Sequence, residues 1–419
     1  DMKKNIFYAQ SGGVTPVINA TAAGLFDAIK SNKKYFGNIY VGKNGIDGAL
    51  EENLIDLKKE DTKELKKLKK TPGGAFGSCR IKLSDPIKNK KEFERIINVF
   101  EAHNIGYFFY NGGGDSQDTT LKLAQFSKDM GYDLKCIGLP KTIDNDLPVT
   151  STCPGFGSVA KYIAISTYEA SLDVASMAKS STKVFLLEVM GRHAGWLAAS
   201  SGVIKKQRVD PPHIILLPEI IFNEKKFIGS IKKIIKKVGY CVIVTSEGIK
   251  DKNNKFIAAS KSRDSFGHAH LGGVAPKLAD IIKNKVGVKV HWAVADYLQR
   301  AARHAASKTD VDQAYAIGKE AISLVKKNID SVMLTIEEVQ NKNMYKWRVS
   351  HTKLENVANK EKVLPKNYIS ADGFGITEKC KKYVQNLIKG EDYPNYKNGL
   401  PDYAKLSHPL VKKKLKKFK

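Results

Sequence analysis

Short apolar runs typical of β-strands alternate with segments of helical periodicity along most of this chain. In chain order, the first half contains a strand-like run at 5–8, helical patterns at 16–29 and 92–103, a strand-like run at 106–110, a helical pattern at 118–130 and a strand-like run at 135–139. The second half repeats the alternation, with strand-like runs at 183–190, 213–217 and 240–245. Apolar strands separated by helices are typical of parallel sheets that are buried on both faces. The pattern therefore predicts an α/β protein with two doubly wound, mainly parallel sheets.

The chain is long enough for two such lobes, since 42% of its 419 residues are hydrophobic. It has no uninterrupted apolar run of about 18 residues, which a membrane span requires, and no apolar signal segment at its start. Its five cysteines stand singly, without the spacing of metal ligands. Such cysteines indicate reduced thiols. These features favour a cytoplasmic protein that does not associate with membranes.

The formal net charge of +27 raises the question of a polyanionic partner. Most of the excess is lysine spread along the chain, and residues 405–419 hold seven lysines and no acid. Lysines on helix faces usually serve solvation, and no motif with interleaved aromatic residues indicates nucleic-acid binding. A positive field would also suit phosphate-rich substrates. Nucleic acid is therefore an unlikely partner, although a basic binding protein remains an alternative.

Two glycine-rich turns follow predicted strands, where ligands of doubly wound sheets bind. In the first, Gly12 and Gly13 would let the backbone approach a phosphate, and the helix that follows would offer its N-terminal N–H groups. In the second, three glycines precede Asp115 and Ser116. Asp115 could be a helix N-cap, could touch a magnesium shell, or could occupy the space that a larger phosphate donor needs. Either turn alone is a weak signal, because neither matches a standard nucleotide-binding motif.

The turn at 140–148 is the most informative, because it places Lys141 beside the closely spaced acids Asp144 and Asp146. Phosphoryl transfer needs a base for the acceptor hydroxyl and a cation that offsets charge on the transferring group. Turn formation by Asp and Asn would explain the acids alone, but it explains neither the lysine nor the pairing. This turn is therefore the candidate catalytic centre.

A fourth turn follows the strand-like run that ends near Met190. Gly191 allows close approach of a ligand, and Arg192 can clamp a phosphorylated sugar through two hydrogen bonds. His193 stands at the start of a helix, where a histidine is more often structural, so it is not a catalytic candidate.

Taken in order, these turns resemble the phosphofructokinase family over residues 3–310. The resemblance rests on the glycine turns at 11–13 and 112–116, Pro-x-Thr-Ile-Asp-Asn-Asp at 140–146 and Met-Gly-Arg at 190–192. The segments 154–158, 266–268 and 297–300 further resemble the pyrophosphate-dependent members. The resemblance implies two Rossmann-like lobes of phosphofructokinase type plus a C-terminal extension. Residues 1–158 with 299–349 would bind the phosphoryl donor, 159–298 would bind the sugar phosphate, and 350–419 would form the extension with its basic tail.

The resemblance also implies roles for the catalytic turn. Asp144 would take the proton from the 1-hydroxyl of fructose 6-phosphate, Asp146 would support it, and Thr142 would help to hold the transferring phosphoryl group. The donor would meet Arg80 and the residues of the two glycine turns, namely Gly12, Gly13, Gly113, Gly114, Asp115 and Ser116.

The sugar phosphate would be held by the second lobe. Its hydroxyls and ring would meet Met190, Gly191, Arg192 and Glu247, and its 6-phosphate would meet Tyr297 and Arg300. Lys183 and His291 stand where the family usually offers arginines from a neighbouring subunit, so a homodimer or homotetramer with shared sites is implied.

Two positions favour pyrophosphate over ATP as the donor. ATP-dependent members usually carry Gly-Asp-Gly in the second glycine turn and a glycine before Thr-Ile-Asp, whereas this chain has Gly114-Asp115 and Lys141. An aspartate would repel and crowd the α-phosphate of ATP: two like charges 4 Å apart repel by ~4 kcal/mol at an effective dielectric near 20. A compact lysine cation suits the short, highly charged pyrophosphate. The aspartate that usually helps to hold magnesium is replaced by Gly114, so Asp115 and Asp144 are the candidate ligands of Mg²⁺.

The predicted activity is reversible, magnesium-dependent transfer of a phosphoryl group from pyrophosphate to fructose 6-phosphate. An ATP-dependent kinase and a pyrophosphate-dependent enzyme that also accepts sedoheptulose 7-phosphate remain alternatives. The alternative from another class is a basic nucleic-acid-binding protein on an inactive kinase fold.

Overall fold

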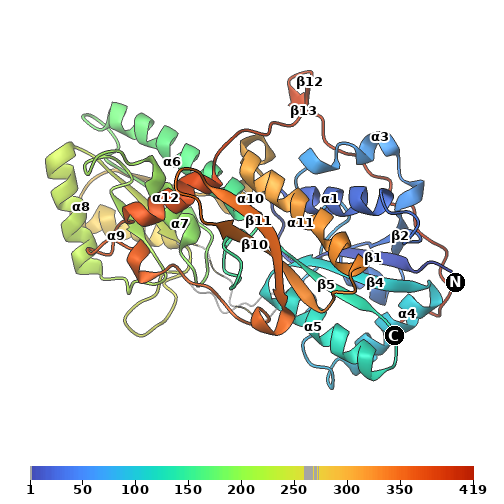
Figure 1. The fold of residues 1–419 in the computed structure, drawn as a ribbon. Helices are drawn as coiled ribbons and strands as arrows, with labels where there is room; N and C mark the ends of the chain where they lie inside the picture. Colours follow the sequence, from blue (N-terminus) through green and yellow to red (C-terminus); the bar gives the residue numbers. More distant parts are fainter. Residues whose placement is uncertain (1, 259–267, 269–270, 272) are drawn as a thin grey trace.

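The computed structural model describes residues 2–258, 268, 271 and 273–419, which form two α/β lobes and a C-terminal extension (Figure 1). The first lobe contains a seven-stranded sheet in the order β11-β10-β5-β4-β1-β2-β3. Its strands are β1 (Asn5–Gln10), β2 (Ile39–Gly42), β3 (Leu54–Asp56), β4 (Ile105–Gly112), β5 (Lys135–Pro140), β10 (Val332–Val339) and β11 (Lys346–Lys353). All neighbouring pairs are parallel except β2–β3 and β10–β11.

Helices cover both faces of this sheet, as the uninterrupted apolar character of its central strands requires. Ile6 and Tyr8 of β1 face a core shared with α1 (Ile18–Lys30) and α11 (Lys308–Lys326). Phe7 and Ala9, on the opposite side of the same strand, face a core shared with α4 (Lys90–Ala102) and α5 (Gly114–Asp129). The predicted double-sided burial is therefore confirmed at β1.

The second lobe is built on a four-stranded parallel sheet in the order β7-β8-β6-β9. Its strands are β6 (Val184–Val189), β7 (Ile214–Leu216), β8 (Cys241–Ser246) and β9 (Val290–Val294). One face packs on α6 (Phe156–Met177) and α7 (Trp196–Ser200), and the other on α8 (Glu224–Val238) and α9 (Val274–Val286). The short helix α10 (Asp296–Ala301) leads the chain back to the first lobe. Two doubly wound lobes are thus present, as predicted.

The elements agree with the predicted ones to within a few residues, with one instructive exception. The helix expected at 118–130 begins four residues earlier, at Gly114, and its N-cap is Gly113. Asp115 and Ser116 therefore lie in the first helical turn, and the interpretation of Asp115 as an N-cap is wrong. The expected boundary between residues 349 and 350 falls inside β11, which has only a few partly buried side chains to mark it as a strand.

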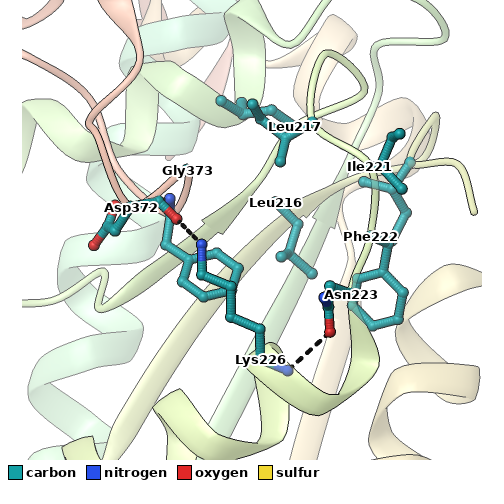
Figure 2. A pocket seen from close by; sticks show the side chains of 11 residues that line it. Leu216, Leu217, Ile221, Phe222, Asn223, Lys226, Asp372 and Gly373 are labelled. Atoms are coloured by element: carbon teal, nitrogen blue, oxygen red, sulfur yellow. Dashed lines mark hydrogen bonds between the residues drawn. The ribbon is translucent and has the colours of Figure 1, made fainter. Parts of the chain in front are cut away.

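The extension after β11 crosses both lobes (Figure 1). Its helix α12 (Glu378–Leu387) adds Cys380, Val384 and Leu387 to the core between α6 and α7. Before α12, residues 372–374 cover the outer edge of β7, where the N–H group of Ile215 donates to the carbonyl oxygen of Phe374 at 2.8 Å. Figure 2 shows Asp372 and Gly373 of this segment beside Lys226 of α8, whose Nζ donates to the carbonyl oxygen of Asp372 at 2.5 Å. The small pocket that they leave there has a volume of only about 40 Å³.

Beyond the hairpin of β12 (Tyr396–Lys397) and β13 (Leu400–Pro401), the basic tail returns to the first lobe. The N–H group of Val411 donates to the carbonyl oxygen of Leu54 at 2.8 Å, so the tail runs beside the edge strand β3. Buried Glu52 accepts the N–H groups of Lys414 and Leu415 at 2.7 and 3.0 Å. As expected, the extension packs on the core. Among the described helices, none combines the length and apolar character that crossing a bilayer requires.

Candidate active site

A cleft of about 750 Å³ lies where the strand ends of the two lobes face each other. The first sheet contributes the turns after β1, β4 and β5, and the second contributes the turns after β6 and β8, followed by α10. Most of the predicted site residues line this cleft: Gly12, Gly13, Arg80, Gly113, Gly114, Asp115, Ser116, Lys141, Thr142, Asp144, Asp146, Met190, Arg192, Glu247, Tyr297 and Arg300. The predicted turns therefore lie around one cleft.

Three cationic side chains converge on the turn after β1. Lys141 is only 6% exposed, and its Nζ donates to the carbonyl oxygen of Gly13 at 2.5 Å. A Cβ atom on Gly13 would lie 2.8 Å from Nη1 of Arg300 and 3.2 Å from Nη2 of Arg80. Gly13 is therefore needed because any side chain there would displace the two guanidinium groups.

The crowding of cations changes the titration of Lys141. Burial, and then the charges of Arg80 and Arg300, lower its pKa to about 7, while Asp144 and Asp146 oppose the shift. We call the group of Lys141, Arg80 and Arg300 the cationic corner. A bound polyphosphate would place negative charge beside it and would favour the protonated form of the Lys141 amine. The corner is thus suited to a small, multiply charged anion.

The turn after β4 presents the N-terminus of the 16-residue helix α5 to the cleft. Its unpaired N–H groups and the helix dipole favour an anion there. Ser116 donates its hydroxyl to Ser11 at 2.6 Å and so joins the two glycine turns. Asp115 is held on both carboxylate oxygens, at 3.2 Å from Nζ of Lys82 and 3.1 Å from Nε2 of His268.

The turn after β5 carries the acid pair in a fixed conformation. Asn145 is fully buried with φ of 54°, in the left-handed region that asparagine tolerates. Its Oδ1 accepts the N–H group of Cys153 at 2.9 Å, and its Nδ2 donates to the hydroxyl of Tyr383 at 2.9 Å. The amide between the two acids is therefore structural, and it leaves Asp144 and Asp146 lining the cleft.

The surroundings of the acids favour their protonated forms. Desolvation, and then the charges of Asp146 and Glu247, raise the pKa of Asp144 well above its usual range. The pKa of Asp146 is also raised, first by desolvation and then by Glu361. Among the described residues, Oδ1 of Asp144 has no hydrogen-bond partner. A carboxylate with a raised pKa that lines the cleft is suited to proton abstraction or metal contact.

The second lobe supplies a polar wall opposite the acid pair. Gly191 has φ of 127°, which favours glycine, and its N–H group donates to Oε1 of Glu247 at 3.3 Å. Gly191 thus shapes the wall from behind, since it does not itself line the cleft. Desolvation raises the pKa of Glu247 to about 7. The guanidinium of Arg300 stacks over the ring of Tyr297, 4.0 Å from its centroid.

Two predicted residues lie apart from this cleft. Lys183 directly precedes β6, at the end of the sheet opposite the cleft, and its Nζ donates to the carbonyl oxygen of Ala178 at 2.5 Å. His291 lies exposed in β9. Within a single chain they do not reach the site. Of the segment 266–268, Phe266 and Gly267 lie outside the described residues.

Several cleft residues were missed from the sequence. Asn359, Lys360 and Glu361 come from the C-terminal extension, Asp296 begins α10, and Lys82 and His268 hold Asp115. Lys82 could have been suspected, because it stands two residues from Arg80, on the same side of an extended segment. Residues 359–361 carry no sequence signal that connects them with the acid turn, which lies more than 200 residues earlier.

The described residues contain no group of three His, Cys, Asp or Glu side chains that could hold a metal by themselves. Magnesium often uses only one or two carboxylates and completes its shell with substrate phosphates and water. Asp144 meets that requirement, because it lines the cleft. Both oxygens of Asp115 are already engaged, one by Nζ of Lys82 and the other by the ring of His268, which makes it the poorer ligand.

Comparison with known proteins agrees with this site. The phosphofructokinase family model matches residues 5–325. The pyrophosphate–fructose 6-phosphate 1-phosphotransferases of Methylococcus capsulatus and Halomonas elongata are each 54% identical to this chain, over 98% and 99% of both sequences respectively. The crystal structure of the pyrophosphate-dependent phosphofructokinase of Marinobacter aquaeolei is 52% identical, covers 99% of both chains and superposes with a TM-score of 0.91. This chain belongs to the phosphofructokinase family.

Proposed function

We propose that this phosphofructokinase transfers a phosphoryl group from pyrophosphate to the 1-hydroxyl of fructose 6-phosphate, giving fructose 1,6-bisphosphate and phosphate, and that it does so reversibly. The observation that carries the proposal is the buried Lys141, bonded to Gly13 and flanked by Arg80 and Arg300. This corner offers three cations to a donor of two phosphates. The names of the relatives that match over almost the whole chain point to the same reaction.

The acceptor side of the reaction depends on Asp144. Its carboxylate takes the proton of the sugar hydroxyl as the oxygen attacks the terminal phosphorus of pyrophosphate. The bond from that phosphorus to the bridging oxygen breaks, and phosphate leaves. A base whose pKa is raised by desolvation shares the proton more evenly with the hydroxyl, which makes the transfer more efficient near neutral pH. Asp146 supports this carboxylate electrostatically from the same turn.

The donor side depends on positioning and charge neutralisation, since phosphoryl transfer involves little covalent work by the protein. Lys141, Arg80 and the N-terminal turn of α5 offset the charge of the two phosphates. Magnesium, when bound, supplies further neutralisation and a template for the phosphates. We infer that Asp144 would hold the magnesium ion, and that Asp146, which lines the same cleft, would support it electrostatically.

The preference against ATP rests on Asp115 as well as on Lys141. Lys82 and His268 fix the carboxylate of Asp115 in the first turn of α5, so it cannot readily swing aside for a nucleotide. The two partners weaken its charge repulsion toward an α-phosphate, and the steric obstruction remains. An ATP-dependent kinase is therefore the less favoured alternative.

The sugar phosphate is assigned to the wall of the second lobe. Arg192 and Arg300 offer cations for its phosphate, and Glu247 accepts hydroxyl groups. Among the described residues of this wall, we assign none to the length of the sugar chain, so sedoheptulose 7-phosphate remains an additional acceptor to be tested. Nucleic acid is disfavoured, because no motif with interleaved aromatic residues accompanies the basic tail.

We infer that two copies of the chain share their sites. Large apolar side chains are exposed on α6, at Ile165, Tyr168 and Leu172, and on the edge strand β9, at Trp292. His291 lies in the edge strand β9, and Lys183 directly precedes its neighbour β6. A second copy seated there would cover the apolar side chains and could receive both basic groups in its cleft. This proposal gives Lys183 and His291 a role that a single chain does not.

The reaction can be followed directly by phosphorus NMR. Purified protein incubated with fructose 6-phosphate, pyrophosphate and magnesium should form one fructose 1,6-bisphosphate and one phosphate for each pyrophosphate consumed. The same enzyme should form pyrophosphate from the two products. Hydrolysis of pyrophosphate without sugar phosphorylation would contradict the proposal.

A further inference from the structure

The C-terminal extension contacts the acid turn at its centre. The hydroxyl of Tyr383, in α12, accepts a hydrogen bond from Nδ2 of Asn145 at 2.9 Å and donates to the carbonyl oxygen of Ser151 at 2.6 Å. Asn145 stands between the two acids and is fully buried in the left-handed conformation. The tyrosine hydroxyl therefore accepts the side-chain amide of Asn145, the residue that connects Asp144 with Asp146.

A second contact reaches the same turn from the segment that precedes α12. The N–H group of Lys362 donates to the carbonyl oxygen of Asp146 at 2.6 Å. Its side chain donates to the carbonyl oxygen of Thr150 at 2.8 Å, just beyond the turn. The preceding residues Asn359, Lys360 and Glu361 line the cleft itself.

The same segment is bonded to the sugar-side turn of the other lobe. The carbonyl oxygen of Lys362 accepts from Nε1 of Trp196 at 3.2 Å. Glu219 joins the two parts with its carboxylate, which accepts the N–H group of Leu364 at 2.8 Å and that of Gly195 at 3.0 Å. Gly195 and Trp196 directly follow the turn that carries Met190, Arg192 and His193 into the cleft.

Aromatic packing completes the connection. The ring of Tyr383 lies 5.2 Å from that of Trp196, and Trp196 is only 3% exposed. Groups from the extension thus contact both the acid turn of the first lobe and the sugar-side turn of the second. The residues that bond to Asn145 and Asp146 stand more than 200 positions later in the chain.

We propose that Tyr383 is a positioning residue for the acid pair, acting through Asn145, and that Glu219 and Lys362 fix the distance between this pair and the sugar-side turn. The proposal rests on the proposed function, because it assigns the extension a part in the same phosphoryl transfer. Small displacements of a reacting group are costly, with losses of ~10²-fold for a misplacement of about 1 Å. The extension is then part of the active site rather than an appendage to the fold.

Tyr383→Phe tests the proposal, because it removes one oxygen atom and keeps the ring on Trp196. It should lower kcat about tenfold or more, since the base is misplaced. It should leave the KM for pyrophosphate within about twofold, since Lys141, Arg80 and Arg300 are untouched. Tyr393→Phe, an equally conservative change at an exposed tyrosine of the same extension, should leave both constants unchanged. A wild-type kcat in Tyr383→Phe would overturn the proposal, as would a lower melting temperature with unchanged kcat per folded molecule.

Glu219→Gln is the second variant, in case Tyr383→Phe fails to fold. It replaces one carboxylate oxygen by an amide group and so weakens the bonds that Glu219 accepts from Leu364 and Gly195. It should raise the KM for fructose 6-phosphate several-fold while the KM for pyrophosphate stays constant. Glu224→Gln, at an exposed ion pair with Lys285 in the same lobe, is its control and should behave like wild type. Unchanged kinetics in Glu219→Gln would count against the connection between the lobes.

Hydrogen–deuterium exchange separates a failure of this inference from a failure of the proposed function. In Tyr383→Phe, amide exchange in residues 140–148 should become faster than in wild type and in Tyr393→Phe, whichever substrates the enzyme uses. Unaltered exchange in this segment would overturn the inference even if the enzyme uses pyrophosphate. Faster exchange in a protein with no pyrophosphate activity would keep the inference and reject the proposed function.

Discussion

The side-chain nitrogen of Lys141 lies 2.5 Å from the carbonyl oxygen of Gly13 and so connects the turn after β5 with the turn after β1. This bond fixes a cation at the place where two glycines leave room for a ligand. The bond joins two residues that are 128 positions apart in the chain. We propose that the donor preference of the enzyme follows from this relationship, and changing the lysine alone tests the proposal.

Lys141→Met should raise the KM for pyrophosphate at least tenfold. Methionine keeps much of the side-chain length and loses the charge, and hydrogen bonds to charged groups contribute about 1.5–3 kcal/mol. Initial rates at varied pyrophosphate and saturating fructose 6-phosphate give the constant. Lys135→Met, at the other end of the same strand, is the matched control, because Lys135 only approaches Asp330 at 3.9 Å near the surface. Equal KM values in the two variants would show that Lys141 does not bind the donor.

Asp144→Asn should lower kcat by ~10²-fold or more, the usual contribution of a general base. The amide has nearly the same shape but cannot take the proton of the acceptor hydroxyl. Single-turnover measurements with fructose 6-phosphate and pyrophosphate would separate the chemical step from product release. A rate near that of the wild type would mean that another group is the base.

The pH dependence of kcat/KM should have two limbs with different origins. The raised pKa of Asp144 means that the base becomes ionised only as the pH rises through that value, so activity increases along the acidic limb. The pKa of Lys141, lowered to about 7, means that the cation is lost as the pH rises further, so activity decreases along the alkaline limb.

Lys141→Arg separates these limbs, because the guanidinium keeps its charge over this whole range. The variant should lose the alkaline limb, even if its maximal rate is lower, and keep the acidic one. Profiles of kcat/KM for pyrophosphate between about pH 5 and pH 9 cover the expected range. An alkaline limb that is identical in both proteins would rule out Lys141 as its source.

The double variant Asp115→Gly with Lys141→Gly should gain use of ATP and lose use of pyrophosphate. The first change clears the N-terminal turn of α5, and the second removes the cation suited to a short donor. The ratio of kcat/KM for ATP to that for pyrophosphate should rise by ~10-fold or more, if each change is worth about 1 kcal/mol. If the double variant neither used nor bound ATP, the explanation of donor choice would be wrong.

Hybrid oligomers test whether sites are shared. A variant with Asp144→Asn lacks its base, and a second with Lys183→Ala and His291→Ala lacks the groups that it would lend. If the sites are shared in a dimer, random mixing of equal amounts restores about a quarter of wild-type activity, because half of the dimers are hybrids with one complete site. The mixture should be dissociated and reassembled before the assay. Activity no higher than the average of the two separate proteins would reject shared sites.

Much of the site could be predicted because its residues lie in short turns after apolar strands. The signals of Gly12, Asp144 and Gly191 are local, and the rule that ligands meet strand ends of parallel sheets brings them together. The prediction failed at Asp115, because the helix was expected to begin four residues later than it does. A glycine-rich helix N-terminus lacks the apolar periodicity on which the prediction depended.

The role of the extension could not be predicted from the sequence. Tyr383 and Lys362 act through bonds to Asn145 and to the backbone of Asp146, and backbone acceptors leave no trace in residue type. Likewise, the tail was judged by its lysines, whereas it is held by backbone amides on Glu52. Contacts of this kind depend on the folded geometry alone.

The most direct test of the account is a steady-state comparison of donors. Purified wild-type protein, supplied with fructose 6-phosphate and magnesium, should turn over with pyrophosphate and show a kcat/KM for pyrophosphate at least ~10²-fold above that for ATP, as two independent obstacles to ATP would produce. Turnover with ATP alone would keep the fold and the base at Asp144, and it would contradict the assignment of Lys141 and Asp115 as determinants of the donor.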